Sequence, residues 1–387
     1  MASAFNNSIN ISSSPFIPVL NFFFNHIYLL LLVIVGCIGN TFVIIIFGQR
    51  AFRTTIQCIG STMSVYPFLF YMAISDTLYL FILFCLWLSN YMNVLHRQGI
   101  CQITLYLTYV CNFINAYYTI AFTAQRLIAV INPIRVSHFL SWYRSRCLAL
   151  SIIIFACVIY SYIPFLVGIV GDKCLSYEER RWINQYMDII DCIIVFLIPY
   201  IVIITMNTII VISLNRLKYG RQEFLFQSQL QFLTRRELTR RNASRKMTKL
   251  LLTVSTSYLI ICAPYACIHT WRLLAELRKG EKSILVSQLE TYAHFIYHTS
   301  FAMNFYLYIV FGSKFRRELK RIYAKTKQNL SHYFHEKNFF EHDNQSELTD
   351  KHSTLTVEFT FDADTNVVHS HTSNTLLNYC CCCQYSL

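Results

Sequence analysis

The chain has 387 residues, of which 55% are hydrophobic and only 14% are charged, so it carries more apolar surface than one soluble core of this size would bury. Its formal net charge is +13, but the basic residues are confined to a few segments between long uncharged runs, which fits a membrane surface better than nucleic acid. These figures argue against an ordinary soluble protein and predict an all-α protein embedded in a bilayer.

Seven stretches are long and apolar enough to cross about 30 Å of hydrocarbon as helices. Six of them are free of Asp, Glu, Lys and Arg, and the other is interrupted only by Asp76, an intramembrane carboxylate that is costly enough to indicate a function. In chain order they cover residues 22–47, 66–91, 101–125, 147–170, 192–215, 250–271 and 291–312. We therefore predict an N-terminal tail over residues 1–23 and a seven-helix transmembrane bundle over residues 24–312.

The connections between these stretches differ in basic charge. One set, together with the segment after the last stretch, holds twenty-two Lys and Arg residues, and the other set holds eight. This imbalance predicts a multi-pass plasma-membrane protein with an extracellular N terminus and a cytoplasmic C terminus. Glycosylation sequons at Asn6 and Asn10 would then face the glycosylating side, although Asn242, Asn329 and Asn344 match the same pattern on the cytoplasmic side.

The segment after the last stretch has its own pattern. Phe315, Leu319 and Ile322 recur at helical spacing among basic residues, which predicts a short amphipathic eighth helix at the membrane interface over residues 313–325. We expect residues 326–387 to form a disordered cytoplasmic tail. Its four consecutive cysteines are candidates for palmitoylation, with metal binding or unmodified thiols as alternatives: Cys380, Cys381, Cys382 and Cys383.

The third stretch carries the most specific motif. It ends with Gln125 and Arg126, followed by Ala-Val and Asn-Pro, and Cys101 lies 25 residues before Arg126. This pattern resembles the rhodopsin-like G-protein-coupled receptors, and the resemblance covers about residues 24–325. The other matching positions are Gly39-Asn40, residues 73–76, Pro199, Pro264 and the string from Asn304 to Tyr308.

The resemblance implies roles for several of these residues. Cys101 would form a disulfide with Cys174 in the second outer loop, which is chemically sensible on the oxidising side of the membrane. Activation and G-protein coupling would involve Gln125, Arg126, Pro264, Asn304 and Tyr308. A polar cluster of Asn40, Asp76, Asn115 and Asn304 is interpreted either as a purely structural hydrogen-bond network or as a site that also holds a sodium ion.

The sequence also departs from the family pattern. Gln125 stands where an acid usually precedes the arginine, Cys262 stands where a tryptophan is common, and Phe305 replaces a proline. Two ligand classes are argued against. A retinal pigment needs a lysine where this chain has His298, and amine receptors use an aspartate where it has Thr108.

The outer halves of the last three stretches instead hold both charge signs and aromatic rings, which favours a peptide ligand with cationic and aromatic groups. The candidate ligand-binding residues are Thr108, Asp191, Tyr265, His269, Glu290, His294 and His298. An alternative for Asp191 and Glu290 is that both simply reach water at the helix ends. Several motifs also resemble invertebrate neuropeptide receptors of the FMRFamide-like group.

We therefore expect a receptor for an extracellular ligand, a neuropeptide, that signals through a heterotrimeric G protein. Arrestin, a receptor kinase and membrane lipids are further expected partners, and no cofactor is expected. The alternatives are a receptor for a non-peptide small molecule, as in chemosensation, and a ligand-gated channel or transporter. No enzyme motif occurs in the sequence, and a zinc site formed by His294, His298 and His269 would lack a further carboxylate or cysteine ligand.

Overall fold

The computed structural model describes most of the predicted bundle. The described residues are 16–57, 66–89, 91–92, 97, 99–132, 142–170, 173–227, 235–278, 284–313, 315–329 and 331. The chain divides into two compact units, Met1–Ile322 and Tyr323–Leu387. The predicted glycosylation sites at Asn6 and Asn10, most of the predicted tail and the four tail cysteines lie outside the described residues.

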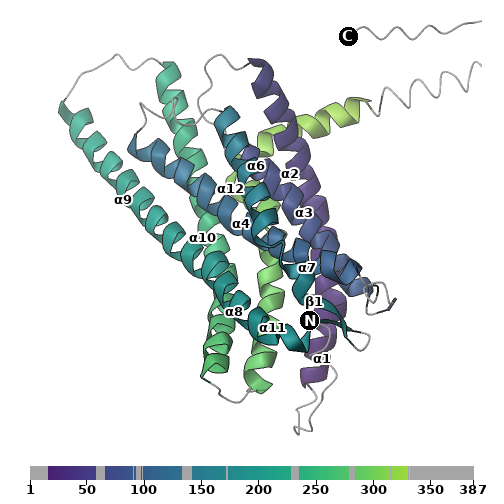
Figure 1. Ribbon diagram of the computed structural model, residues 1–387. Helices are drawn as coiled ribbons and strands as arrows, with labels where there is room; N and C mark the ends of the chain where they lie inside the picture. The colour runs from purple at the N-terminus through teal and green to yellow at the C-terminus, as the bar shows by residue number, and fades with distance from the viewer. Residues whose placement is uncertain are drawn as a thin grey trace, which may run out of the picture. The chain divides into compact units, whose positions relative to one another are not determined.

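Seven helical segments form the first unit in the described part of the chain (Figure 1). Three segments are single helices: α3 (Tyr66–Leu88), α4 (Ile100–Ile131) and α10 (Arg235–Leu277). The other four change helix type or bend along their length, and in chain order they comprise α1 (Phe16–Phe22), η2 (Phe23–Tyr28) and α2 (Leu29–Gln57); α6 (Trp142–Ile159) and α7 (Ile163–Leu166); α8 (Arg181–Asp191), η5 (Cys192–Leu197) and α9 (Ile198–Gln227); and α11 (Ile284–His298), η6 (Thr299–Phe301) and α12 (Asn304–Phe311).

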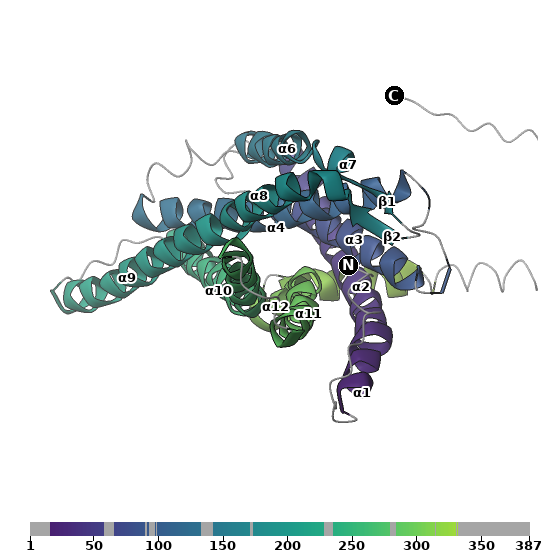
Figure 2. The same cartoon turned by 60° about the horizontal axis from the view of Figure 1, so that its bottom comes forward.

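Helix α4 occupies the centre of the bundle, where it contacts α3, α6, α9 and α10 (Figure 2). By length and composition, five of the seven segments contain a helix apolar enough to cross a membrane. The two others are α4, which carries many Tyr, Thr and Asn side chains, and the last segment, which is interrupted between α11 and α12. The seven-helix fold predicted from the sequence is confirmed.

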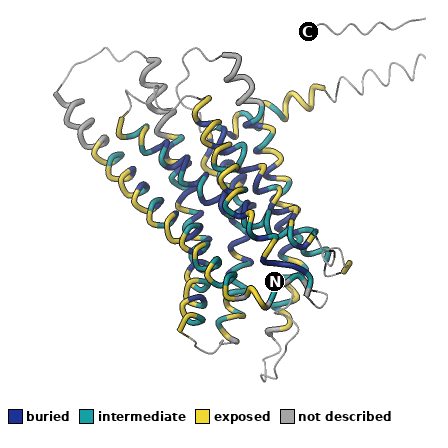
Figure 3. Tube along the Cα trace, in the orientation of Figure 1, coloured by how far each residue is buried: buried dark blue, intermediate teal, exposed yellow. Residues whose placement is uncertain are grey.

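Buried and exposed residues alternate along the helices of the bundle (Figure 3). The interior holds aromatic, aliphatic and polar side chains, and the surface exposes many large hydrophobic ones. Tyr118, Phe122 and Phe301 are fully buried, whereas Val158 and Ile260 are 66% and 67% exposed. In water, contact with so many exposed aliphatic side chains would be unfavourable in free energy. In a lipid environment this cost is absent. The distribution of side chains is therefore that of a membrane protein.

Glycine allows close contact between the first and last helical segments. A Cβ atom placed on Gly36 of α2 would lie 2.6 Å from Leu80 Cδ1 and 2.8 Å from Ala302 Cβ, and one on Gly39 would lie 2.9 Å from Phe305 Cβ. Small residues commonly allow such approaches between membrane helices. The Gly39 contact gives a physical reason for the glycine in the Gly39-Asn40 motif.

Gly36→Val is therefore expected to lower the free energy of unfolding by about 1–3 kcal/mol, because the added isopropyl group has no room against Leu80 of α3 and Ala302. The measurement is the apparent Tm of the purified receptor. Ile38→Val on the exposed face of the same helix is the matched control, and an equal Tm for both variants would contradict the tight packing at Gly36.

Residues 315–329 are helical. In the first unit, Phe315 is buried, and its ring lies 5.6 Å from that of Tyr308 and 5.8 Å from that of Phe47. Leu319 and Ile322 also pack against the core. The amphipathic pattern thus turns Phe315, Leu319 and Ile322 toward the bundle.

Candidate functional site

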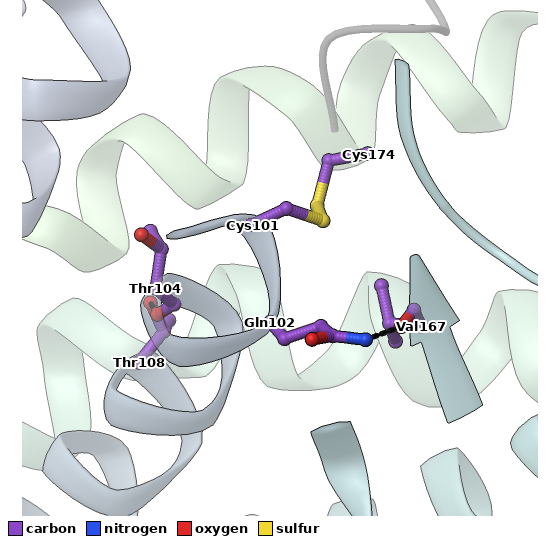
Figure 4. Close-up of a disulfide and its surroundings, with 6 residues drawn as sticks. All are labelled: Cys101, Gln102, Thr104, Thr108, Val167 and Cys174. Atoms are coloured by element: carbon purple, nitrogen blue, oxygen red, sulfur yellow. Dashed lines mark hydrogen bonds between the residues drawn. A yellow bond between two sulfur atoms is a disulfide. The ribbon is translucent and has the colours of Figure 1, made fainter. Parts of the chain in front are cut away.

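One end of the bundle carries a short hairpin and a disulfide, and we call it the disulfide end. Strands β1 (Val167–Val170) and β2 (Lys173–Ser176) pair antiparallel, with Ile169 opposite Cys174. Cys174 is joined to Cys101 at the start of α4, with 5.7 Å between their Cα atoms (Figure 4). Gln102 Nε2 also donates to the Val167 carbonyl at 3.0 Å. The predicted Cys101–Cys174 disulfide is present, and it fixes the hairpin to α4.

The predicted polar cluster lies in the middle of the bundle. Asn115 Nδ2 on α4 and Asn304 Nδ2 on α12 each donate to a different oxygen of the Asp76 carboxylate, both at 2.9 Å. Asn40 Nδ2 donates instead to the carbonyl of Phe301 in η6, also at 2.9 Å. All four polar residues are at most 4% exposed. Asp76 therefore ties three helices together, and Asn40 holds the irregular turn beside it.

Helix geometry brings Asn304 to this cluster. Helix α11 ends at His298, a 3₁₀ turn covers Thr299–Phe301, and α12 begins at Asn304. The Met303 amide still donates to the Thr299 carbonyl at 3.1 Å. This chain breaks the helix without the family's proline, since Phe305 occupies that position.

The opposite end of α4 carries Arg126, and we call this the Arg126 end of the bundle. Arg126 is 4% exposed, and its neighbour Gln125 donates through Nε2 to Ser145 Oγ on α6 at 2.8 Å. Tyr308 is 1% exposed. Pro264 lies inside α10, which continues as one helix through it. Gln125, in the place of the family's acid, thus connects α4 to α6, a contact that the sequence did not indicate.

At the disulfide end, α10 and α11 are joined by an ion-pair network. Glu290 on α11 lies 2.8 Å from His269 Nδ1 and 2.8 Å from Arg272 Nε, both on α10. Arg272 also pairs with Glu276 at 3.1 Å on its own helix. Glu290 therefore already has two partners within the protein, the positively charged Arg272 and the titratable His269.

Two carboxylates on α8 have a different environment. Tyr109 donates to Asp188 at 3.2 Å, and Tyr160 donates to Asp191 at 2.5 Å. In the described part of the chain, neither carboxylate forms an ion pair. Asp191 was predicted as a ligand residue from its position, but its tyrosine partner, which lies between α6 and α7, was not recognisable from sequence spacing.

Aromatic rings fill the space between these polar groups. The ring of Tyr265 lies 5.2 Å from that of His269, 4.6 Å from that of His294 and 5.6 Å from that of Phe196. Five of the seven predicted ligand residues thus lie at the disulfide end. Four of them form one cluster on α10 and α11, namely Tyr265, His269, Glu290 and His294, and Asp191 lies apart on α8.

Two predicted ligand residues are engaged elsewhere. Thr108 Oγ1 donates to the Thr104 carbonyl of its own helix at 2.8 Å (Figure 4). His298 is 5% exposed and hydrogen-bonds to Tyr79 on α3. No group of three or more His, Cys, Asp or Glu side chains among the described residues is arranged to hold a metal ion.

Comparisons with known proteins agree with this architecture. The family model for seven-transmembrane receptors of the rhodopsin family matches residues 39–308. No curated protein matches the chain. The matched region includes the disulfide, Asp76, Arg126, Pro264 and Tyr308, and proteins of this family are receptors rather than enzymes. The chain therefore belongs to the rhodopsin family of seven-transmembrane receptors, as a multi-pass membrane protein.

Proposed function

We propose that this receptor binds an extracellular peptide that carries a cationic group, and that it signals through a heterotrimeric G protein. The disulfide end would face outward and the Arg126 end would face the cytoplasm, as the distribution of basic residues in the sequence predicts. The observation that carries the ligand proposal is the difference between the acids at the disulfide end.

Glu290 forms an ion pair with Arg272 and also contacts His269 Nδ1 within the protein. Among the described residues, Asp188 and Asp191 accept hydrogen bonds from tyrosine hydroxyls and from the side-chain amide of Asn184. Neither forms a direct ion pair there, although the side chains of His269 and Arg272 are near enough to act on them electrostatically. Charged groups within a membrane protein are costly unless they are paired. A guanidinium or ammonium group of a ligand would supply the missing charge, and nearby rings such as Tyr265 would accommodate its aromatic groups.

At the Arg126 end, the G protein would dock beside Arg126 and the basic segment 235–249 at the start of α10. This segment holds seven Lys and Arg residues, so contact with anionic lipid headgroups is a second role for the same charges. Palmitoylation of the tail cysteines and recruitment of arrestin after phosphorylation remain predictions from the sequence.

The Asp76 cluster also fits a sodium ion. Asn115, whose Nδ2 donates to Asp76, has its Oδ1 buried without a hydrogen-bond partner among the described residues. A carboxylate with neutral oxygens is the ligand set that hard cations prefer. We propose that these residues hold sodium, whose charge would stabilise the buried carboxylate in the resting receptor.

The function is tested by challenging cells that express the full-length receptor and a promiscuous G protein with amidated peptides, small amines and lipids. A calcium response to a peptide at nanomolar concentration, abolished by Arg126→Ala at equal surface expression, is the expected result. A response only to amines or lipids would contradict the peptide ligand. Ligand-driven current that is independent of G protein would instead favour a channel.

A further inference from the structure

A column of histidine and tyrosine side chains runs from the ion-pair network at the disulfide end toward the Asp76 cluster. The ring of Tyr265 lies 4.6 Å from that of His294, at an angle of 29°. The ring of His294 lies 4.2 Å from that of His298. His298 Nδ1 and Tyr79 Oη are hydrogen-bonded at 3.0 Å. The column therefore connects α10 to α11 and α11 to α3.

The inner end of the column reaches the polar cluster. The ring of Tyr79 stacks on that of Phe301, with centroids 3.7 Å apart and an angle of 15°. The Phe301 carbonyl accepts the hydrogen bond from Asn40, and Tyr79 lies three residues after Asp76 on α3. A shift of Tyr79 or Phe301 would therefore change the positions of the groups around both Asn40 and Asp76.

His298 lies at the point where α11 ends. It is the last residue of α11, directly before the 3₁₀ turn Thr299–Phe301. Tyr79 and His298 are 1% and 5% exposed, so water does not compete for their hydrogen bond. This bond fixes the end of α11 against α3 at the point where the helix changes geometry.

The outer end of the column depends on α10. Pro264 removes one backbone hydrogen bond there and allows α10 to bend, and Tyr265 follows it directly. Cys262 is fully buried, but it has no ring where the family commonly has a tryptophan. Tyr265 instead makes an aromatic contact between α10 and α11, with its ring 5.2 Å from that of Tyr297. A bend of α10 at Pro264 would therefore move Tyr265 against His294.

We propose that Tyr79 and His298 are positioning residues for receptor activation, which hold α10 in its resting position through His294 and Tyr265. This role rests on the proposed receptor function, but it concerns a hydrogen bond between two side chains of the protein itself. Loss of the Tyr79–His298 hydrogen bond would release the end of α11 and shift the population toward the conformation in which the Arg126-end half of α10 moves.

The test uses hydrogen exchange in the purified full-length receptor in lipid nanodiscs, without ligand. Tyr79→Phe and His298→Phe each keep a ring and remove one hydrogen-bonding group. His298→Asn keeps a polar group near the position of Nδ1. Tyr118→Phe is the matched control, since its fully buried hydroxyl donates to the Ala149 carbonyl at the same 3.0 Å, outside the column.

We expect Tyr79→Phe and His298→Phe to speed exchange of residues 247–258 in α10 by about 3- to 10-fold, and the double variant to be no faster than either single variant. His298→Asn and Tyr118→Phe should exchange at the wild-type rate. Unchanged exchange at 247–258, or faster exchange confined to residues 299–303, would show a local structural role and overturn the proposal.

Nucleotide exchange on a purified heterotrimeric G protein, measured with the same preparations, separates this proposal from the proposed function. Faster exchange of α10 with no nucleotide release in any variant would support the positioning role and contradict G-protein coupling. Nucleotide release that is equal in all variants, with unchanged exchange of α10, would support coupling and overturn the positioning role.

Discussion

Replacing Cys101 and Cys174 together by serine is expected to lower the free energy of unfolding by about 2–4 kcal/mol. The disulfide joins residues 73 positions apart, so its loss frees a long loop in the unfolded chain. It also releases β2 from α4, so that the hairpin would be held to α4 only by hydrogen bonds such as that from Gln102. Chemical unfolding of the purified receptor in mixed micelles measures the loss, and surface expression should fall with it.

Cys267→Ser provides the matched control, because Cys267 is an exposed free cysteine. It should unfold like the wild type. A reducing agent should destabilise the wild type and Cys267→Ser but leave the double serine variant unchanged. A double variant as stable as the wild type would show that the hairpin is held by hydrogen bonds such as that from Gln102.

Asp76→Ala is expected to cost about 2–4 kcal/mol of stability, because it leaves the buried amide groups of Asn115 and Asn304 without their acceptor. Asn40→Ala removes a single donor to the Phe301 carbonyl and should cost about 1 kcal/mol. The apparent Tm of both variants, measured in sodium chloride and in choline chloride, tests the structural and the sodium role together.

In the wild type, sodium should raise the apparent Tm relative to choline, because an ion that binds only the folded state stabilises it. In Asp76→Ala this difference should vanish. An equal Tm of the wild type in the two salts would contradict the sodium site while leaving the hydrogen-bond network intact. A loss of stability in Asp76→Ala no larger than in Asn40→Ala would contradict the central place of the carboxylate.

The hydrophobic pattern predicted all seven membrane segments, because a run of about twenty apolar residues rarely forms anything other than a membrane-spanning helix. It did not predict where the helices end. Helix α10 begins at Arg235, fifteen residues before the apolar run at Leu250, and α1 begins at Phe16, within the expected N-terminal tail. The first turns of α10 are polar and basic, so hydropathy carries no signal there, whereas α1 extends the apolar run of the first segment toward the N terminus.

Contacts between side chains of different helices were predicted only for residues that belong to motifs of the family. The Asp76 cluster and the disulfide followed from such motifs. The contacts of Gln125 with Ser145, of Asp191 with Tyr160 and of His298 with Tyr79 did not, because they depend on the rotation and depth of each helix. Sequence spacing within one helix does not determine either quantity.

The central claim, a cationic peptide bound by Asp188 and Asp191, is tested most directly by pairing peptide and receptor changes. Each active arginine-containing peptide is compared with its uncharged citrulline analogue on the wild type and on the double variant Asp188→Asn/Asp191→Asn, with the exposed Glu179→Gln as control. On the wild type and the control, citrulline should weaken the calcium response about 10- to 100-fold. On the double variant, both peptides should be equally weak. Equal potency of the two peptides on the wild type, or silence of every peptide at verified surface expression, would contradict the account.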